Sequence, residues 1–232
     1  MRITLNSYFF LISSTIITLV FYILPYSYIT LYPLLLLSTL SHELAHGISA
    51  LLIGCQFNEL IIDIDCSGQV LISGNISKLG KAFIAVSGIL SPSICSCLCF
   101  FLVIFINISR FIMLIFGLLL LYIELIYIRF SYSLFFITLL SLALIYISIK
   151  ARDWLVQLSI IFAGIQLAIS VLAKFDYFFL KYINTSNGLI LSDVSKISES
   201  LCFPYWFWGF ICFILSISIV LLGLIFLIKN ID

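Results

Sequence analysis

Charge is the property that this sequence has least of. Only 9% of its 232 residues are charged, whereas 64% are apolar. Soluble domains usually carry about a quarter charged residues and an apolar share near one half. The composition therefore excludes a soluble enzyme and a disordered chain. Eleven Lys and Arg against ten Asp and Glu leave no basic excess for nucleic acid, so an integral membrane protein is expected.

Cysteine patterns that would hold a metal or a disulfide framework are also missing. The seven cysteines are scattered, without the spacing of a zinc finger. Cys95, Cys97 and Cys99 alternate within one apolar stretch, and alternate residues of a helix point about 200° apart. These three side chains therefore do not form one metal-binding face, and we interpret them as small packing residues.

Long apolar runs are what the sequence has in plenty. A helix needs roughly 20 mostly apolar residues to cross a bilayer, and the ten-residue alternation of a membrane barrel is absent. The runs predict a single all-α polytopic membrane domain over residues 1–232, with six or seven transmembrane helices. They are approximately Tyr8–Leu24, Tyr28–Ile53, Ala82–Ile108, Phe111–Ile128, Tyr132–Ile149, Trp154–Ala173 and Tyr205–Ile228.

Two polar segments separate these runs. Residues 57–81 alternate partly around Cys66-Ser67-Gly68, which predicts a small interfacial β-hairpin. Residues 181–203 are the most polar part of the chain and predict a loop with a short helix before Pro204. With seven spans, seven Lys and Arg would lie on the side of the N-terminus and four on the other. This distribution favours a cytoplasmic N-terminus by the positive-inside rule.

The only two histidines stand four residues apart, in His42-Glu43-Leu44-Ala45-His46 of the second run. Residues i and i+4 of a helix lie one turn apart on one face. Two imidazoles so placed can bind one zinc ion, and Glu43 beside them can act as general base toward a water at the metal. The alternative is a helix whose histidines only hydrogen-bond to neighbours. The scarcity of charge within membrane spans favours the functional interpretation.

A catalytic zinc site needs a third protein ligand and an open position, and without a third histidine this ligand should be a carboxylate. Asp176 ends the sixth run, and Asp193 lies in the polar segment 181–203. Spacing does not choose between the two. The other acidic candidates have simpler interpretations as solvated hairpin residues, a partner of Arg129 or a residue at a helix start: Glu59, Asp63, Asp65, Glu124 and Asp153.

Three stretches resemble the site-2 protease family of intramembrane zinc metalloproteases, and most closely its compact B-type peptidase branch. Ser41–Gly54 is similar to the family's H-E-x-G-H-A helix, with Ala45 where glycine is common. Ala85–Pro92 is similar to the A-x-A-G-x-x-G-P stretch that follows the hairpin. Gly164–Asp176, followed by Ser192-Asp193-Val194, is similar to the branch's C-terminal region with its S-D-A motif.

The resemblance implies a Zn²⁺ ion within the membrane, with Glu43 as the catalytic residue and His42 and His46 as ligands. In the wider family an L-D-G motif supplies the carboxylate ligand, and this sequence has none. We predict Asp176, on a late helix, as the substitute and Asp193 as the alternative. The implied reaction is hydrolysis of a peptide bond in the transmembrane segment of a substrate protein. The partners are then that substrate and the lipid bilayer, with no nucleic acid.

Two other functions fit the sequence less well. A catalytically degenerate zinc-binding scaffold or regulator would explain the missing L-D-G motif, but it would not need Glu43. A metal or proton-coupled transporter should carry polar residues on several spans and often an internal repeat. The other runs are nearly free of such residues, so a zinc-dependent intramembrane peptidase is the predicted function.

Two structural expectations accompany this function. Gly88, Ser91 and Pro92 should let the third run approach the motif helix closely, because small residues bring membrane helices together. The hairpin at Ile61–Ile72 could present a free strand edge to an unwound substrate, or it could be a simple interfacial connector.

Overall fold

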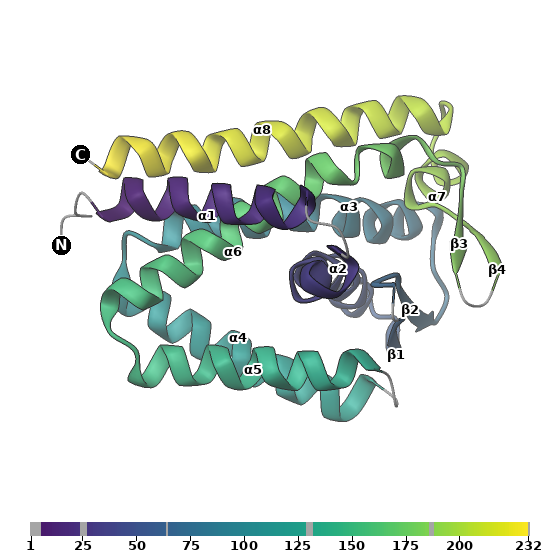
Figure 1. Cartoon of the computed structure of the whole chain (residues 1–232). Helices are drawn as coiled ribbons and strands as arrows, with labels where there is room; N and C mark the ends of the chain where they lie inside the picture. Colours follow the sequence, from purple (N-terminus) through teal and green to yellow (C-terminus); the bar gives the residue numbers. More distant parts are fainter. Residues whose placement is uncertain (1–5, 24–26, 64, 129–131, 186–187, 232) are drawn as a thin grey trace.

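All seven apolar runs form helices in the computed structural model, which describes residues 6–23, 27–63, 65–128, 132–185 and 188–231 (Figure 1). The predicted all-α polytopic fold is confirmed. The helices are α1 (Asn6–Ile23), α2 (Ser27–Leu52), α3 (Lys78–Leu102), α4 (Ile106–Tyr127), α5 (Tyr132–Lys150), α6 (Asp153–Ala173) and α8 (Tyr205–Ile231).

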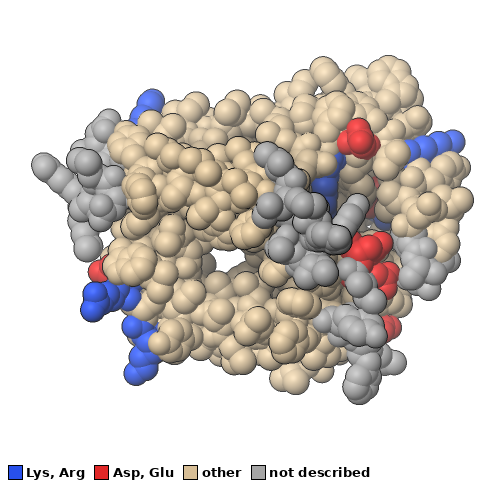
Figure 2. All heavy atoms as spheres, viewed as in Figure 1, with Lys and Arg blue, Asp and Glu red and all other residues tan. Residues whose placement is uncertain are grey.

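Five of these helices are long and apolar enough to cross a membrane, namely α3, α4, α5, α6 and α8, and α1 is a shorter apolar helix over Tyr8–Tyr22. Large apolar side chains lie on the outside, among them Leu125 with 84% of its surface exposed. In the face shown in Figure 2, the charged residues gather at the two ends and leave an apolar belt between them. The chain is therefore an integral multi-pass membrane protein.

Helix α2 has a different direction from its neighbours. In Figure 1 it is seen almost along its axis, while α1, α5 and α8 run across the view. Its Ser, His, Glu and Gly residues make it more polar than the five candidate spans. Helix α3 packs against α2, α6 and α8. The motif helix thus crosses the bundle, at the end where the hairpins lie.

The structure distributes the Lys and Arg residues between the two ends of the bundle differently from the seven-span count given by the sequence. Helix α1 begins, and α8 ends, at the same end of the molecule (Figure 1). The first residues of α4 and the last residues of α5 lie at that end as well, so Arg110 and Lys150 fall on the side where α1 begins. Lys78, at the start of α3, and Lys196, on α7, lie at the opposite end with the hairpins, although the seven-span count placed both with the N-terminus. The count therefore no longer distinguishes the two ends, and the cytoplasmic N-terminus stays a prediction.

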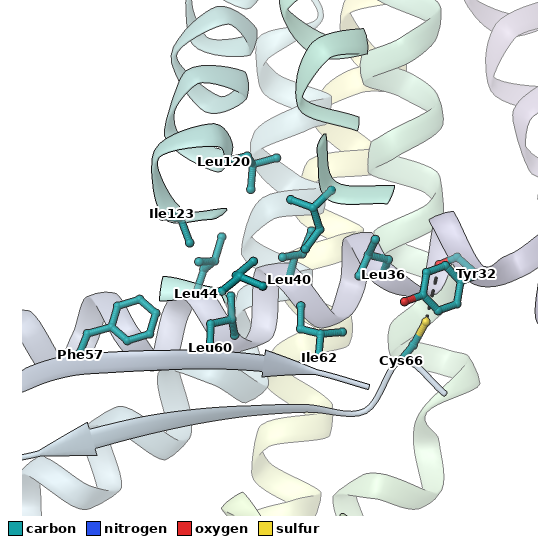
Figure 3. Close-up of a cluster of buried hydrophobic side chains, with 12 residues drawn as sticks. Tyr32, Leu36, Leu40, Leu44, Phe57, Leu60, Ile62, Cys66, Leu120 and Ile123 are labelled. Atoms are coloured by element: carbon teal, nitrogen blue, oxygen red, sulfur yellow. Dashed lines mark hydrogen bonds between the residues drawn. The ribbon is translucent and has the colours of Figure 1, made fainter. Parts of the chain in front are cut away.

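One face of α2 is fixed by apolar packing. Leu36, Leu40 and Leu44 recur at every fourth position and contact Leu60 and Ile62 of the following strand (Figure 3). The same buried cluster includes residues of α4 and α5. Residues two positions from this leucine stripe point to the opposite side of the helix. The packing of the leucines therefore turns the two histidines toward α3.

The predicted hairpin after the motif helix is confirmed. Strand β1 (Gln56–Ile62) pairs antiparallel with β2 (Gly68–Ser73), with a register irregularity between Phe57 and Glu59. Leu60 and Ile62 of β1 are fully buried, whereas the residues of β2 are partly or fully exposed. The hairpin therefore packs on α2 through β1.

The polar segment 181–203 contains more structure than the predicted loop. The short helix is present as α7 (Asp193–Ser200), and before it stands a second antiparallel hairpin of β3 (Tyr182–Thr185) and β4 (Gly188–Leu191). Its four-residue strands are too short to show clear alternation in the sequence. The Asn187-Gly188 pair, typical of hairpin turns, is the signal that could have revealed it.

Candidate metal centre

Helix α2 brings the two histidines of the motif together. The Nε2 atoms of His42 and His46 lie 3.1 Å apart, and the ring centroids lie 4.6 Å apart. His46 is buried, and His42 is partly exposed. The predicted helical spacing therefore places one nitrogen of each ring at a common point.

Asp193 completes the group from a distant part of the chain. Its Oδ2 atom lies 3.0 Å from Nε2 of His42 and 3.2 Å from Nε2 of His46. Asp193 is the first residue of α7, and the Ser192 side chain before it accepts a hydrogen bond from the backbone N–H of Ser195. This cap fixes the residue at which α7 begins. It therefore also fixes the backbone position from which the Asp193 carboxylate extends.

The other predicted carboxylate, Asp176, lies elsewhere. It is exposed on η1 (Phe175–Phe179), the 3₁₀ turn that follows α6. Within the described ranges, the group of His, Cys, Asp and Glu residues that could hold a metal consists of His42, His46 and Asp193. The structure thus joins the second of the two predicted carboxylates to the histidines, and leaves Asp176 outside the group.

The remaining acidic candidates have other surroundings. Glu124 is buried on α4 and accepts a hydrogen bond from the hydroxyl of Thr138, while its expected partner Arg129 lies outside the described residues. Asp153 pairs with Arg110 at 2.6 Å. The acidic residues of the β1–β2 hairpin are likewise outside the group, so Asp193 is the carboxylate that meets the histidines.

The three ligand atoms fit a tetrahedral metal ion in kind and in spacing. Two imidazole nitrogens and one carboxylate oxygen resemble the three protein ligands of many catalytic zinc sites. Ligands about 2.0–2.2 Å from a tetrahedral ion lie roughly 3.3–3.6 Å apart. The observed separations of 3.0, 3.1 and 3.2 Å are close to that value. The group could therefore hold a metal with small adjustments.

Hydrogen bonds outside the group orient its members. Nδ1 of His46 lies 2.8 Å from the carbonyl oxygen of Ile84. When Nδ1 carries the proton and donates it there, the lone pair of Nε2 faces the group, as in many metal sites. Lys196 Nζ donates to Oδ1 of Asp193 at 2.8 Å, and the hydroxyl of Tyr177 donates to Oδ2 at 2.7 Å. These hydrogen bonds thus fix the orientation of the His46 ring and of the Asp193 carboxylate.

Electrostatics keeps Asp193 ionised. Burial by itself raises the pKa of this carboxyl, but the nearby charges of His46 and Lys196 and the hydrogen bonds from both histidines hold the pKa well below its usual value. Lys196 in turn has its pKa raised, because Asp193 outweighs the effect of burial. A negatively charged oxygen therefore faces the two imidazoles.

Glycines allow the neighbouring elements to reach the motif. A Cβ atom on Gly88 of α3 would overlap the imidazole ring of His46, and one on Gly68 of β2 would lie 2.5 Å from Cγ of Glu43. Ser91 on α3 donates from Oγ to the carbonyl oxygen of Ser41 at 2.5 Å. The predicted close approach of α3 to the motif helix is confirmed, and it leaves room for the histidine ring.

Two cavities meet at the group. The larger, about 560 Å³, lies between β2, β4 and the first turns of α3. The smaller, about 320 Å³, is bounded by α2, α3, α6 and the tip of the β1–β2 hairpin. Five residues line both cavities: His42, Glu43, Gly68, Tyr177 and Ile183. A chain segment placed across the junction would therefore pass the carboxylate of Glu43 and the ring of His42.

These observations define a membrane-embedded helical protein with a candidate centre of two histidines and one aspartate. The chain belongs to the Peptidase M50B-like family, whose model matches residues 13–223. This is the B-type branch of the site-2 proteases that the motifs resemble. No curated protein and no solved structure matches the chain. Membership indicates a peptidase that works in a membrane.

Sequence reasoning missed two residues beside the group. Lys196 could have been noticed, because it stands three residues after Asp193 in a predicted short helix, where such pairs meet on one face. Tyr177 carried no signal among the twelve tyrosines of the chain. Only the packing of η1 brings its hydroxyl to Asp193.

Proposed function

We propose that the protein is a zinc-dependent intramembrane endopeptidase that cleaves the transmembrane segments of other proteins. The ligands are His42, His46 and Asp193, which takes the place predicted first for Asp176, and Glu43 is the catalytic base. The observation that carries the proposal is the convergence of two imidazole nitrogens and a carboxylate oxygen at 3.0–3.2 Å. This convergence lies beside Glu43 in a chain of a peptidase family.

The chemistry follows from the side chains at the junction of the cavities. A zinc ion bound by the three ligands would supply a Lewis acid and lower the pKa of water to about 7. Glu43 is 6% exposed and lines both cavities, so its carboxylate can take the proton of an attacking water. As the carbon–nitrogen bond of the substrate breaks, Glu43 passes that proton to the leaving amine.

The larger cavity suits an extended substrate. It is lined by Gln69, Val70 and Ile72 of β2 on one side and by Ile190 and Leu191 of β4 on the other. Strand β2 pairs with β1, and no other described strand joins that sheet. An unwound segment could add to the edge of β2 that faces away from β1 through its backbone, and place its side chains between the two hairpins. This is the edge role expected from the sequence.

The experiment uses the purified full-length chain in lipid nanodiscs with a model transmembrane substrate. Cleavage should stop with a zinc chelator and return when zinc is added. Glu43→Gln should keep bound zinc and lose cleavage by a factor of at least about 10², whereas wild type at equal zinc content cleaves. Zinc binding without cleavage by the wild-type chain, across a panel of transmembrane substrates, would favour the scaffold alternative.

A further inference from the structure

The junction of the cavities contains one hydrogen-bond donor whose only contact described so far is with Asp193. Of the five residues that line both cavities, two belong to the proposed ligand set and base, Gly68 is part of a hairpin, and Ile183 is apolar. The remaining residue is Tyr177. A substrate bond held near Glu43 would therefore have the phenol of Tyr177 as its neighbour.

Contacts with Asp193, His42 and α8 fix the position of Tyr177. Its hydroxyl lies 2.7 Å from Oδ2 of Asp193, the oxygen that lies 3.0 Å from His42. Its ring stands edge to face against the His42 ring, with centroids 5.7 Å apart. The next residue, Phe178, is buried, and its carbonyl oxygen lies where Gly209 of α8 leaves room for it. Helix α8 therefore holds η1 and points the phenol at the ligand group.

Peptide hydrolysis creates a need for such a donor. When water adds to the carbonyl carbon, negative charge develops on the carbonyl oxygen, and a preorganised donor stabilises it most where water is excluded. A phenol keeps its proton near neutral pH. It can donate a hydrogen bond without taking part in the transfer of the water proton to Glu43 and onward to the amine.

We propose that Tyr177 is a catalytic residue whose hydroxyl donates a hydrogen bond to the carbonyl oxygen of the scissile bond as that oxygen gains negative charge. This inference rests on the peptidase function proposed above. In the structure the same hydroxyl bonds to Asp193, which keeps the donor beside the reacting group. Substrate binding would move the hydrogen bond from Asp193 to the substrate oxygen.

Holding Asp193 in place is a weaker explanation of Tyr177, because other groups already do this. Lys196 bonds to Oδ1 at 2.8 Å, and Ser192 caps the start of α7. Moreover, Lys196 lines only the larger cavity, whereas Tyr177 lines both. A residue that merely supported Asp193 would not need to face the space where the substrate bond lies.

The test is Tyr177→Phe, which removes the hydroxyl and keeps the ring. Zinc affinity, measured by competition with a chromophoric chelator, should equal that of wild type. With a model transmembrane substrate, kcat should fall by about 10²-fold while KM changes little. Affinity for a phosphinic peptide, whose oxygens mimic the tetrahedral oxyanion, should fall in parallel. Tyr182→Phe, on the exposed side of β3, is the matched control and should behave as wild type.

Two results would overturn this inference alone. One is an unchanged kcat and phosphinic-peptide affinity in Tyr177→Phe beside an active wild type. The other is a loss of zinc affinity with full kcat restored at saturating zinc, which would make Tyr177 a positioning residue for Asp193. If the wild-type chain binds zinc and cleaves no transmembrane substrate, the proposed function fails, and the inference falls with it.

Discussion

The two faces of α2 serve opposite purposes within one helix. On one face, Leu36, Leu40 and Leu44 are almost completely buried against β1 and α4. On the other, His42 and His46 meet Asp193. The neighbouring α3 and β2 have glycines where they face this side, so that both elements can come close. The first face is built mainly of leucine side chains, whereas the second carries the two imidazoles. The comparison indicates that dense packing on one side fixes the polar groups on the other.

The largest expected effect is on the polar face. His46→Ala should remove both stoichiometric zinc and cleavage, because the group loses a ligand and leaves the carbonyl oxygen of Ile84 without the imidazole. Metal analysis and the cleavage assay measure this. Retention of full zinc content by a folded His46→Ala protein would show that the metal binds elsewhere.

Next comes the glycine that makes room for the histidine. Gly88→Ala places a methyl group where the His46 ring lies, so the ring must shift and zinc affinity should fall by about 10- to 100-fold, the range for disturbed support of a metal ligand. Gly117→Ala is the control, since its methyl group would meet Ile145, which is not part of the group. Equal zinc affinities in the two variants would contradict the role given to Gly88.

The third prediction concerns the edge of β2 and asks whether this strand binds the substrate next to the polar face of α2. The double substitution Val70→Pro and Ile72→Pro removes two backbone N–H groups from β2 and should reduce cleavage severalfold while zinc remains bound. KM for an extended transmembrane substrate should rise, because fewer backbone hydrogen bonds can form. If cleavage is unchanged while expression is intact, the edge role is wrong, and the hairpin is only a connector.

The smallest effect on catalysis is expected from the leucine face. Leu40→Ala should lower the free energy of unfolding by about 2–4 kcal/mol, because Leu40 is 1% exposed within the cluster. The zinc affinity of the folded fraction should stay at the wild-type value. Leu52→Ala, at a position that is 75% exposed, should change neither quantity. A large loss of zinc affinity in Leu40→Ala, at full folding, would show that the two faces are not separable.

The same contrast explains what the sequence could predict. The seven helices, the first hairpin and the shared face of His42 and His46 follow from local periodicity, and all are present. The choice between Asp176 and Asp193 does not, because it depends on how α7 and η1 dock against α2 and α3. Asp176 and Tyr177 are neighbours in the chain, yet one is exposed and the other bonds to Asp193. Periodicity cannot resolve such a turn.

The direction of α2 was also beyond local reasoning. The sequence marks Tyr28–Ile53 as one apolar run among seven, but the helix crosses the bundle instead of running along it (Figure 1). Tertiary contacts with α3, β1 and β2 set this direction. The contacts of α7 with α3 and α8 bring the segment after α6 back to the histidines, although Asp193 stands 147 positions after His46 in the chain.

The zinc content of two aspartate variants decides whether Asp193 is a metal ligand. Wild type, Asp193→Ala and Asp176→Ala would be purified in parallel and analysed for metal per chain, with folding checked by circular dichroism. We expect equimolar zinc in wild type and Asp176→Ala, and a loss of zinc in Asp193→Ala. Retained zinc in Asp193→Ala, together with its loss in Asp176→Ala, would contradict the metal centre described above.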